Sequence, residues 1–133
     1  MGITKVLCGL IIKDQQILIC RRKPEKSLGG YWEFPGGKLE EGETYEECLA
    51  RELQEELNLR VTVKNHFKTV IHQYDLKTLE LISYRCETED AVIKLVDHDQ
   101  IEWIKVPDLL KWNLAPADVP IAEALIETYK LSE

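Results

Sequence analysis

Two segments rich in β-branched and aliphatic residues open the chain. They run from Lys5 to Ile12 and from Ile17 to Arg21, and the polar KDQQ tetrapeptide between them is typical of a hairpin turn. Val61 to Tyr74 and Leu79 to Cys86 have the same character and predict another pair of strands. Gln100 to Val106 predicts one more. Together these segments predict a β-sheet.

A helical period replaces this pattern between Thr44 and Leu57. Apolar or aromatic residues recur at every fourth position of that segment, at Tyr45, Leu49, Leu53 and Leu57. Thr44 followed three residues later by Glu47 is the pattern of a capping box, which predicts the helix start. Asn58 tolerates the left-handed conformation that closes many helices, so it predicts the end.

Further helical segments are expected toward the C-terminus. Pro107 occupies a helix-start position before a short helical turn, and a helix is expected from about Pro120 to Lys130. A Gly- and Pro-bearing loop from Lys23 to Tyr31 and a short WEFPGG segment separate the first strands from the first helix. Helices and strands in this mixed order predict a layered α+β domain, and we expect residues 1–133 to form a single domain.

The composition excludes several classes of protein. With 44% hydrophobic and 31% charged residues the chain is globular, and no apolar run approaches the roughly 20 residues of a membrane span. The net charge of -7 argues against binding a nucleic-acid polymer, but a nucleotide can bind if a divalent cation lies between. We see no secretory signal, and the four cysteines form no CxxC pair, which favours a cytoplasmic protein. The apolar content does not separate a monomer from a homodimer.

Three glutamates of the predicted helix lie at unexpected angles. At about 100° per residue, Glu56 projects only about 20° from Leu49, Glu52 about 60° and Glu55 about 120°. Arg51 projects roughly opposite Leu49 and should face water together with two neighbours, Glu47 and Gln54. Ionised glutamates are almost never buried without a partner, so a positive group is expected among the three.

A hard divalent cation would satisfy these carboxylates. The cluster contains no Cys or His, so its oxygen ligands suit Mg²⁺, or Mn²⁺, rather than Zn²⁺. Upstream, Gly36 and Gly37 allow the backbone to approach an ion or a phosphate closely. Mg²⁺ often borrows oxygens from substrate phosphates, and the arrangement therefore predicts metal-assisted phosphoanhydride chemistry.

The segment from Gly37 to Leu59 resembles the signature of the Nudix hydrolases, GX5EX7REUXEEXGU. Gly37, Glu43 and the run RELQEELNL stand at the required spacing, and the one departure is Asn58 in place of the usual Gly. WEFPGGK, RRK and NLAPADVPIAEAL resemble the MutT-like branch, in particular bacterial CTP pyrophosphohydrolases and 8-oxo-dGTP diphosphatases. The resemblance implies an α/β/α sandwich with a mixed β-sheet.

The same resemblance implies roles for individual residues. Metal ligands would be Glu52, Glu55, Glu56 and the Gly36 carbonyl, with Glu52 or a neighbouring acid activating water. Arg51 would hold the carboxylates by ion pairing, and Glu43 would support the loop. Related enzymes add an acid from a late loop; Asp97 is the candidate, with Asp99 and Glu102 as rivals and a solvated loop acid as the alternative.

Substrate contacts are expected from several segments. Arg22 matches a family position that contacts substrate, with Arg21 as the register-shifted alternative, because neighbours on a strand point to opposite faces. Trp32 and Phe34 are expected either to offer aromatic faces to the base or to pack in the core. The WEFPGGK segment adds Gly37 and Lys38 to the expected substrate contacts. Asp118 stands where the MutT pattern has Asn. Ionised, it would accept from base N–H groups; protonated, it could read an 8-oxopurine; alternatively it caps the last helix.

The resemblance thus implies a Mg²⁺-dependent hydrolase that converts a nucleoside triphosphate into a monophosphate and pyrophosphate. A second interpretation keeps the fold and metal but takes ADP-ribose, a nucleotide sugar or a dinucleoside polyphosphate. A third is a non-catalytic nucleotide-binding module, which the intact REUXEE core disfavours.

Overall fold

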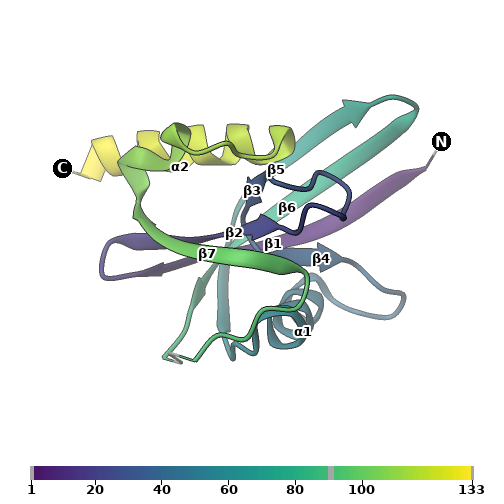
Figure 1. Cartoon of the computed structure of the whole chain (residues 1–133), viewed down its shortest axis with the longest axis horizontal. Helices are drawn as coiled ribbons and strands as arrows, with labels where there is room; N and C mark the ends of the chain where they lie inside the picture. The colour runs from purple at the N-terminus through teal and green to yellow at the C-terminus, as the bar shows by residue number, and fades with distance from the viewer. Residues whose placement is uncertain (1, 90–91, 133) are drawn as a thin grey trace.

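The computed structural model describes residues 2–89 and 92–132, and Figure 1 shows the arrangement of their helices and strands. The N-terminal half forms the elements β1 (Ile3–Lys13), β2 (Gln16–Arg22), β3 (Trp32–Glu33), β4 (Gly36–Lys38) and α1 (Tyr45–Leu57). The C-terminal half forms β5 (Thr62–Tyr74), β6 (Lys77–Glu87), β7 (His98–Lys105), the 3-10 helices η1 (Val106–Lys111) and η2 (Pro116–Asp118), and α2 (Val119–Ser132).

Strand β1 is the centre of a mixed sheet. It runs parallel to β6 from Ile3 to Ile11 and pairs antiparallel with β4 around Leu7. The C-terminal end of β1 turns back into β2 with Lys13 opposite Gln16, which confirms the predicted hairpin. Strand β5 continues the sheet beyond β6, while β3 and β7 flank β2 on its two sides. The predicted mixed sheet is confirmed.

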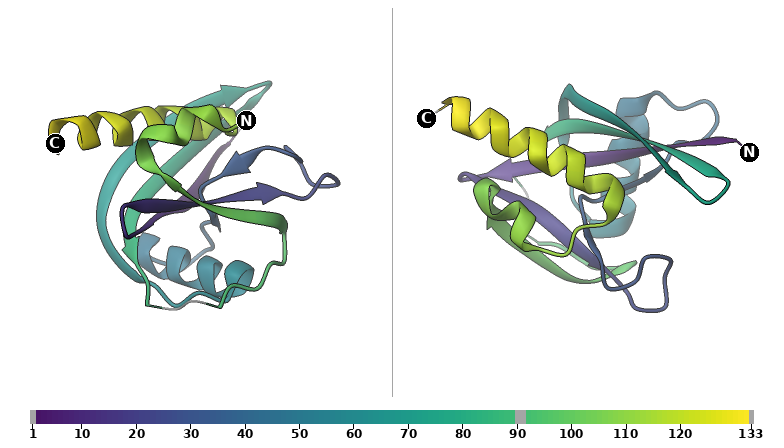
Figure 2. Two further views of the ribbon diagram at one scale, coloured as in Figure 1. Left: turned by 60° about the vertical axis from the view of Figure 1, so that its left-hand side comes forward. Right: turned by 90° about the horizontal axis from the view of Figure 1, so that it is seen from above.

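The two long helices cover opposite faces of this sheet, as Figures 1 and 2 show. Alternate side chains of β1 and β2 supply the two buried layers, as the period-2 geometry of a strand requires. The α1 side buries Leu7, Ile11, Leu18, Leu49, Leu53 and Leu57. The α2 side buries Leu10, Ile17, Ile19, Ile121, Ala122 and Leu125. The α/β/α sandwich implied by the family resemblance is therefore confirmed.

Helix α1 begins and ends where its sequence predicts. The Thr44 side chain accepts from the Glu47 N–H at 3.1 Å, and the Glu47 carboxylate accepts from the Thr44 N–H at 2.9 Å. Asn58 closes the helix in the left-handed region with φ 56 and ψ 35. The helix therefore has a fixed start, which sets the angle at which its glutamates meet the sheet.

The predicted bounds are less accurate elsewhere. Strand β7 begins at His98, two residues before the predicted start, because His98 pairs with Arg22 of β2. Strand β6 likewise begins at Lys77, where the exposed β5–β6 turn extends the pairing beyond the apolar segment. Across residues 2–89 and 92–132, no helix has the length and apolar character needed to cross a membrane.

Candidate active site

A pocket of about 380 Å³ lies between the sheet, α1 and the segment that leads into α2. It brings together residues far apart in the sequence, from β1, the β2–β3 loop, β4, α1, β6 and η2. Its charged lining residues are Arg22, Lys26, Glu33, Lys38, Glu52, Glu56, Asp97 and Asp118. Most of the site residues predicted from the sequence therefore meet in one cavity.

Strand β4 places two glycines against the α1 carboxylates. A Cβ atom added at Gly37 would overlap the carboxyl group of Glu52, and one added at Gly36 would overlap the backbone of Leu7. Both glycines line the pocket. Their lack of side chains is therefore what allows β4 to lie between β1 and the Glu52 carboxylate.

Arg51 connects α1 to the loop before it. Its guanidinium donates to Glu43 at 2.6 and 3.1 Å, to Glu52 at 2.9 Å and to Glu55 at 3.0 Å. The predicted ion-pairing role is thus present in the geometry, but the expectation that Arg51 faces water is wrong. The Arg51 side chain is 25% exposed because the preceding loop folds over it and supplies Glu43 as a partner.

The charge of Arg51 and the burial of the helix separate the pKa values of the glutamates. The hydrogen bond from Arg51 lowers the pKa of Glu43 to about 2. Burial raises the pKa of Glu52, although Arg51 opposes that effect. Burial raises the pKa of Glu56 to about 8, and the nearby charges of Glu52, Asp97 and Glu33 act in the same direction. Among Glu43, Glu52 and Glu56, Glu56 is therefore the one that most lacks a positive partner.

One observation of the structure indicates that the oxygen atoms of this pocket fit a hard divalent cation. The Oε2 atom of Glu56 is buried without a hydrogen-bond partner, beside the carboxyl of Glu52 and the glycine backbone that line the same cavity. Carboxylate and carbonyl oxygens are the ligands that Mg²⁺ and Mn²⁺ prefer. Within the described ranges, His, Cys, Asp and Glu side chains form no group of three or more already arranged around a metal position.

Glu55 occupies a different position from the other two glutamates. Its side chain is 59% exposed, it accepts from Arg51, and it is not among the described residues that line the pocket. The angular separation of about 120° from Leu49 accounts for this position on the flank of the helix. Glu52 and Glu56 face the cavity, whereas Glu55 lies on its rim.

The three candidate acids of the late loop are separated by the structure. Asp97 lines the pocket and forms an ion pair with Lys26 at 3.3 Å. Asp99 instead accepts two hydrogen bonds from Arg21, at 2.8 and 2.9 Å. Glu102 lies further along β7, opposite Ile19, and is exposed. Among the three, Asp97 is the one near Glu56.

The two neighbouring arginines of β2 diverge as predicted. Arg22 lines the pocket, where it donates to Glu33 at 3.3 Å and to the Ser27 carbonyl at 2.7 Å. Arg21 pairs with Asp99 and lies 6.0 Å from the Trp32 ring. The pairing of β2 with β7 shifts register between these two arginines.

The two predicted stacking residues also differ. Both belong to the core on the α2 side, where Phe34 is 3% exposed and Trp32 packs edge-on against Trp112 at 4.9 Å, but Phe34 also lines the pocket. Trp32 is not among the described lining residues, so its core interpretation fits its position.

Asp118 reaches the pocket from the opposite side to α1. Its Oδ2 atom accepts a hydrogen bond of 2.8 Å from the backbone N–H of Phe34. Burial, reinforced by the charge of Glu33, raises the pKa of Asp118 well above its usual range. A protonated Asp118 keeps one O–H donor for a ligand while its other oxygen stays on Phe34. The hydrogen bond to Phe34 links Asp118 to the WEFPGG segment, not to the start of α2.

The structure adds site residues that the sequence analysis did not predict. Glu33 and Lys26 line the pocket, and His98 lies behind Glu33 with its Nε2 atom 2.8 Å from the carboxylate. A charged residue between two buried aromatic residues was the available signal for Glu33. Lys26 and His98 had none, because their partners are distant in sequence.

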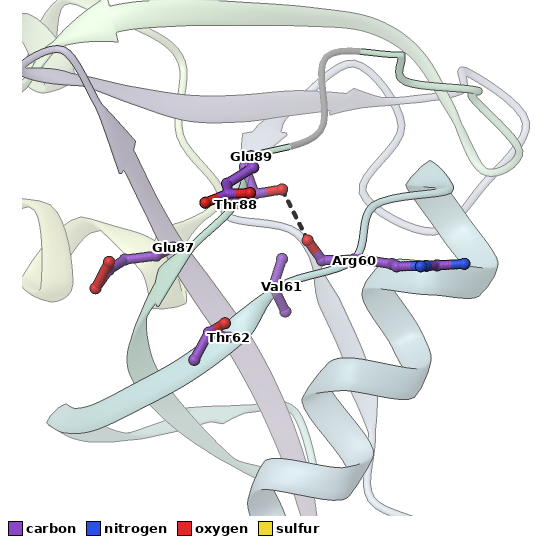
Figure 3. A pocket seen from close by; sticks show the side chains of 6 residues that line it. All are labelled: Arg60, Val61, Thr62, Glu87, Thr88 and Glu89. Atoms are coloured by element: carbon purple, nitrogen blue, oxygen red, sulfur yellow. Dashed lines mark hydrogen bonds between the residues drawn. The ribbon is translucent and has the colours of Figure 1, made fainter.

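A second depression, of about 470 Å³, lies where β5 starts and β6 ends, and Figure 3 shows the side chains around it. Its described lining residues are Arg60, Val61, Thr62, Glu87, Thr88 and Glu89, and the Thr88 hydroxyl donates to the Arg60 carbonyl at 2.8 Å. None of the predicted site residues lines it. The chemistry predicted from the sequence therefore belongs to the first pocket.

The sequence pattern of the NUDIX domain matches residues 7–124, and the chain belongs to the Nudix hydrolase family.

The chain is similar to several proteins that carry functional names. The chain is 29% identical over 126 residues to the CTP pyrophosphohydrolase of Escherichia coli, a match that covers 95% of this chain and 93% of the relative. It is 47% identical over 69 residues to the 8-oxo-dGTP diphosphatase of Proteus vulgaris, covering 52% of this chain and 59% of that protein. A solution structure of the MutT protein of Staphylococcus aureus superimposes with a TM-score of 0.77 at 35% identity, covering 96% and 98% of the two chains.

Proposed function

We propose that this Nudix hydrolase is a divalent-cation-dependent nucleoside triphosphate pyrophosphohydrolase that acts on modified or surplus nucleotides. The observation that carries the proposal is the arrangement of the pocket: Glu52, Glu56 and Asp97 line it together with Asp118 and Phe34. The three acids Glu52, Glu56 and Asp97 suit a metal-bound polyphosphate, and Asp118 and Phe34 suit a nucleobase. The names of the relatives support the same substrate class.

A cation bound here would neutralise charge on the polyphosphate and on the departing oxygen. Its proposed ligands are Glu52, Glu56, Asp97 and the Gly36 carbonyl, with Glu55 reaching in from the rim. Mg²⁺ is the proposed ion and Mn²⁺ the alternative. The unpartnered Glu56 Oε2 atom supports this assignment.

The chain's own residues then orient the reaction. Glu52 or a neighbouring carboxylate accepts a proton from the attacking water. The water oxygen bonds to the β-phosphorus while the bond from that phosphorus to the α–β bridging oxygen breaks, and this oxygen leaves with the α-phosphate. The products are a nucleoside monophosphate and pyrophosphate. Arg51 and Glu43 hold Glu52 in place, and Arg22, Lys38 and Gly37 are the proposed phosphate contacts.

The base is proposed to stack on Phe34 and to be read by Asp118. Because Asp118 is buried with a raised pKa, we propose that it is protonated and donates one hydrogen bond to the base. A donor at this position suits an acceptor on the base, such as the carbonyl oxygens of an 8-oxopurine or of cytosine. The four buried free cysteines support the proposed cytoplasmic location, because thiols stay reduced there.

The test is product analysis with CTP, dCTP, 8-oxo-dGTP, dGTP, ADP-ribose and a dinucleoside polyphosphate, each with Mg²⁺ and with EDTA. Metal-dependent release of pyrophosphate and a monophosphate is expected. Glu56→Gln should abolish turnover, while Glu46→Gln, an exposed residue of the same helix, serves as the matched control. Turnover of ADP-ribose or dinucleotides alone would contradict the proposal, as would full activity in EDTA.

A further inference from the structure

A lysine of the β2–β3 loop pairs with the acid that we propose as a metal ligand. The Lys26 Nζ atom lies 3.3 Å from Asp97 Oδ1, and both side chains line the active-site pocket. We propose that Lys26 is a substrate-binding residue that changes partner: it holds Asp97 in the free enzyme and contacts the polyphosphate once Asp97 binds the cation. This inference rests on the proposed function.

The loop that carries Lys26 is tied together by its backbone. Arg22 N–H donates to Tyr31 O and Gly30 N–H donates to Arg22 O, each at 3.0 Å, which closes the base of the loop. Lys26 itself donates to Lys23 O at 3.0 Å and accepts from Gly29 N–H at 2.9 Å. The Lys26 backbone is therefore held in one place, and only its side chain needs to move.

Asp97 is held from its own side. Its carbonyl accepts from the Lys23 N–H at 3.3 Å, so the two segments are joined by their backbones as well as by the ion pair. The next residue, His98, is fully buried and bonded to Glu33. Rotation of side chains alone can therefore separate Lys26 from Asp97.

Such an exchange costs little free energy. Lys26 is one of the three cationic side chains among the described lining residues, together with Arg22 and Lys38. Arg22, which we also propose as a phosphate contact, donates to Glu33 and to the Ser27 carbonyl in the free protein. The Lys26–Asp97 pair is 42% and 35% exposed, and such exposed pairs contribute little free energy.

This exchange gives Lys26 opposite effects on metal binding and on substrate binding. Without a nucleotide, Lys26 and the divalent cation compete for Asp97, so Lys26 weakens metal binding. With a nucleoside triphosphate, the released ammonium group meets phosphate oxygens and strengthens substrate binding. Metal and nucleotide would then bind cooperatively, because each favours the same position of Lys26.

The experiment compares Lys26→Gln with Lys23→Gln, which removes the same charge from the same loop at a residue that does not line the pocket. Mn²⁺ binding to each nucleotide-free protein is measured by calorimetry, and KM and kcat are measured with CTP and 8-oxo-dGTP. We expect Lys26→Gln to bind Mn²⁺ about two- to fivefold more tightly than wild type. We also expect its KM to rise about tenfold with little change in kcat, and Lys26→Arg to restore KM.

The Asp97→Asn background provides a further check, since Lys26→Gln should have no effect there on Mn²⁺ affinity. The inference is overturned if Lys26→Gln behaves like Lys23→Gln, or if either KM or Mn²⁺ affinity changes without the other. A wild-type protein that releases no pyrophosphate contradicts the proposed function instead. The Mn²⁺ comparison would still decide whether Lys26 holds Asp97.

Discussion

Glu43 and Arg51 join the active-site helix to the loop before it through a hydrogen bond of 2.6 Å from the arginine Nε to the glutamate Oε2. The same guanidinium donates to Glu52, which lines the pocket. The position of Glu52 therefore depends on Arg51 and Glu43, and neither is among the described residues that line the pocket.

This pair predicts an acid-sensitive component of stability. Arg51 lowers the pKa of Glu43 from 4.5 to about 2, so the folded state holds the ionised form more strongly than the unfolded chain does. The stabilisation is present above pH 4.5 and is lost as the pH falls toward 2. Urea unfolding between pH 2 and pH 6 should show a smaller loss of stability for Glu43→Gln than for wild type. Equal losses in both proteins would contradict the prediction.

Glu56 predicts the opposite pH dependence in the metal-free enzyme. Its pKa rises from 4.5 to about 8 on folding, so across this window the folded protein keeps a proton that the unfolded chain has lost. The free energy of unfolding should therefore fall with rising pH, by at most about 1.4 kcal/mol per pH unit. Glu56→Gln should remove this slope when unfolding is followed in EDTA, and Glu46→Gln should keep it. A slope that persists in Glu56→Gln would assign the effect to another group.

Gly37→Ala tests the close approach of β4 to α1. The added methyl group would overlap the Glu52 carboxyl, which can rotate away but then leaves the position in which we propose that it acts. Because a displacement of about 1 Å can cost a hundredfold in rate, we expect kcat to fall by about that factor while the melting temperature changes little. Gly2→Ala, which meets no atom within 4 Å, is the matched control. Unchanged kcat in Gly37→Ala would show that Glu52 does not need this position.

Asp118 predicts a contrast between two substitutions. Asn can still accept from the Phe34 N–H and offers an N–H donor in place of the carboxyl O–H, so Asp118→Asn should retain substrate preference and fold. Asp118→Ala leaves the Phe34 N–H without its acceptor, which costs about 1–3 kcal/mol of stability, and should raise KM. KM for each base and thermal unfolding of both variants are the measurements. Loss of activity in Asp118→Asn equal to that in Asp118→Ala would show that the ionised form reads the base.

The sequence predicted the local parts of this site more fully than the distant ones. The capping box, the left-handed Asn58 and the angles of Glu52 and Glu56 depend on neighbours within one helix, and the structure confirms them. The exposure of Arg51 was predicted wrongly because Glu43 approaches from a loop that a helical projection does not include. The partners Phe34 and Asp118 are 84 residues apart, and His98 and Glu33 are 65 apart. Such pairs are set by the pairing of strands, which residue patterns along the chain do not specify.

The placement of α1 and α2 on opposite faces of the sheet has a practical consequence for redesign. The proposed metal ligands Glu52 and Glu56 belong to α1, while Asp118 stands at the entrance to α2, and the two groups meet only across the cavity. If Asp118 reads the base as we propose, residues of η2 around it can be varied to change the preferred nucleotide without replacing the proposed metal ligands. Such variants should keep a hydrogen-bond acceptor at position 118, because Asp118 bonds to Phe34, two residues before the proposed metal ligand Gly36.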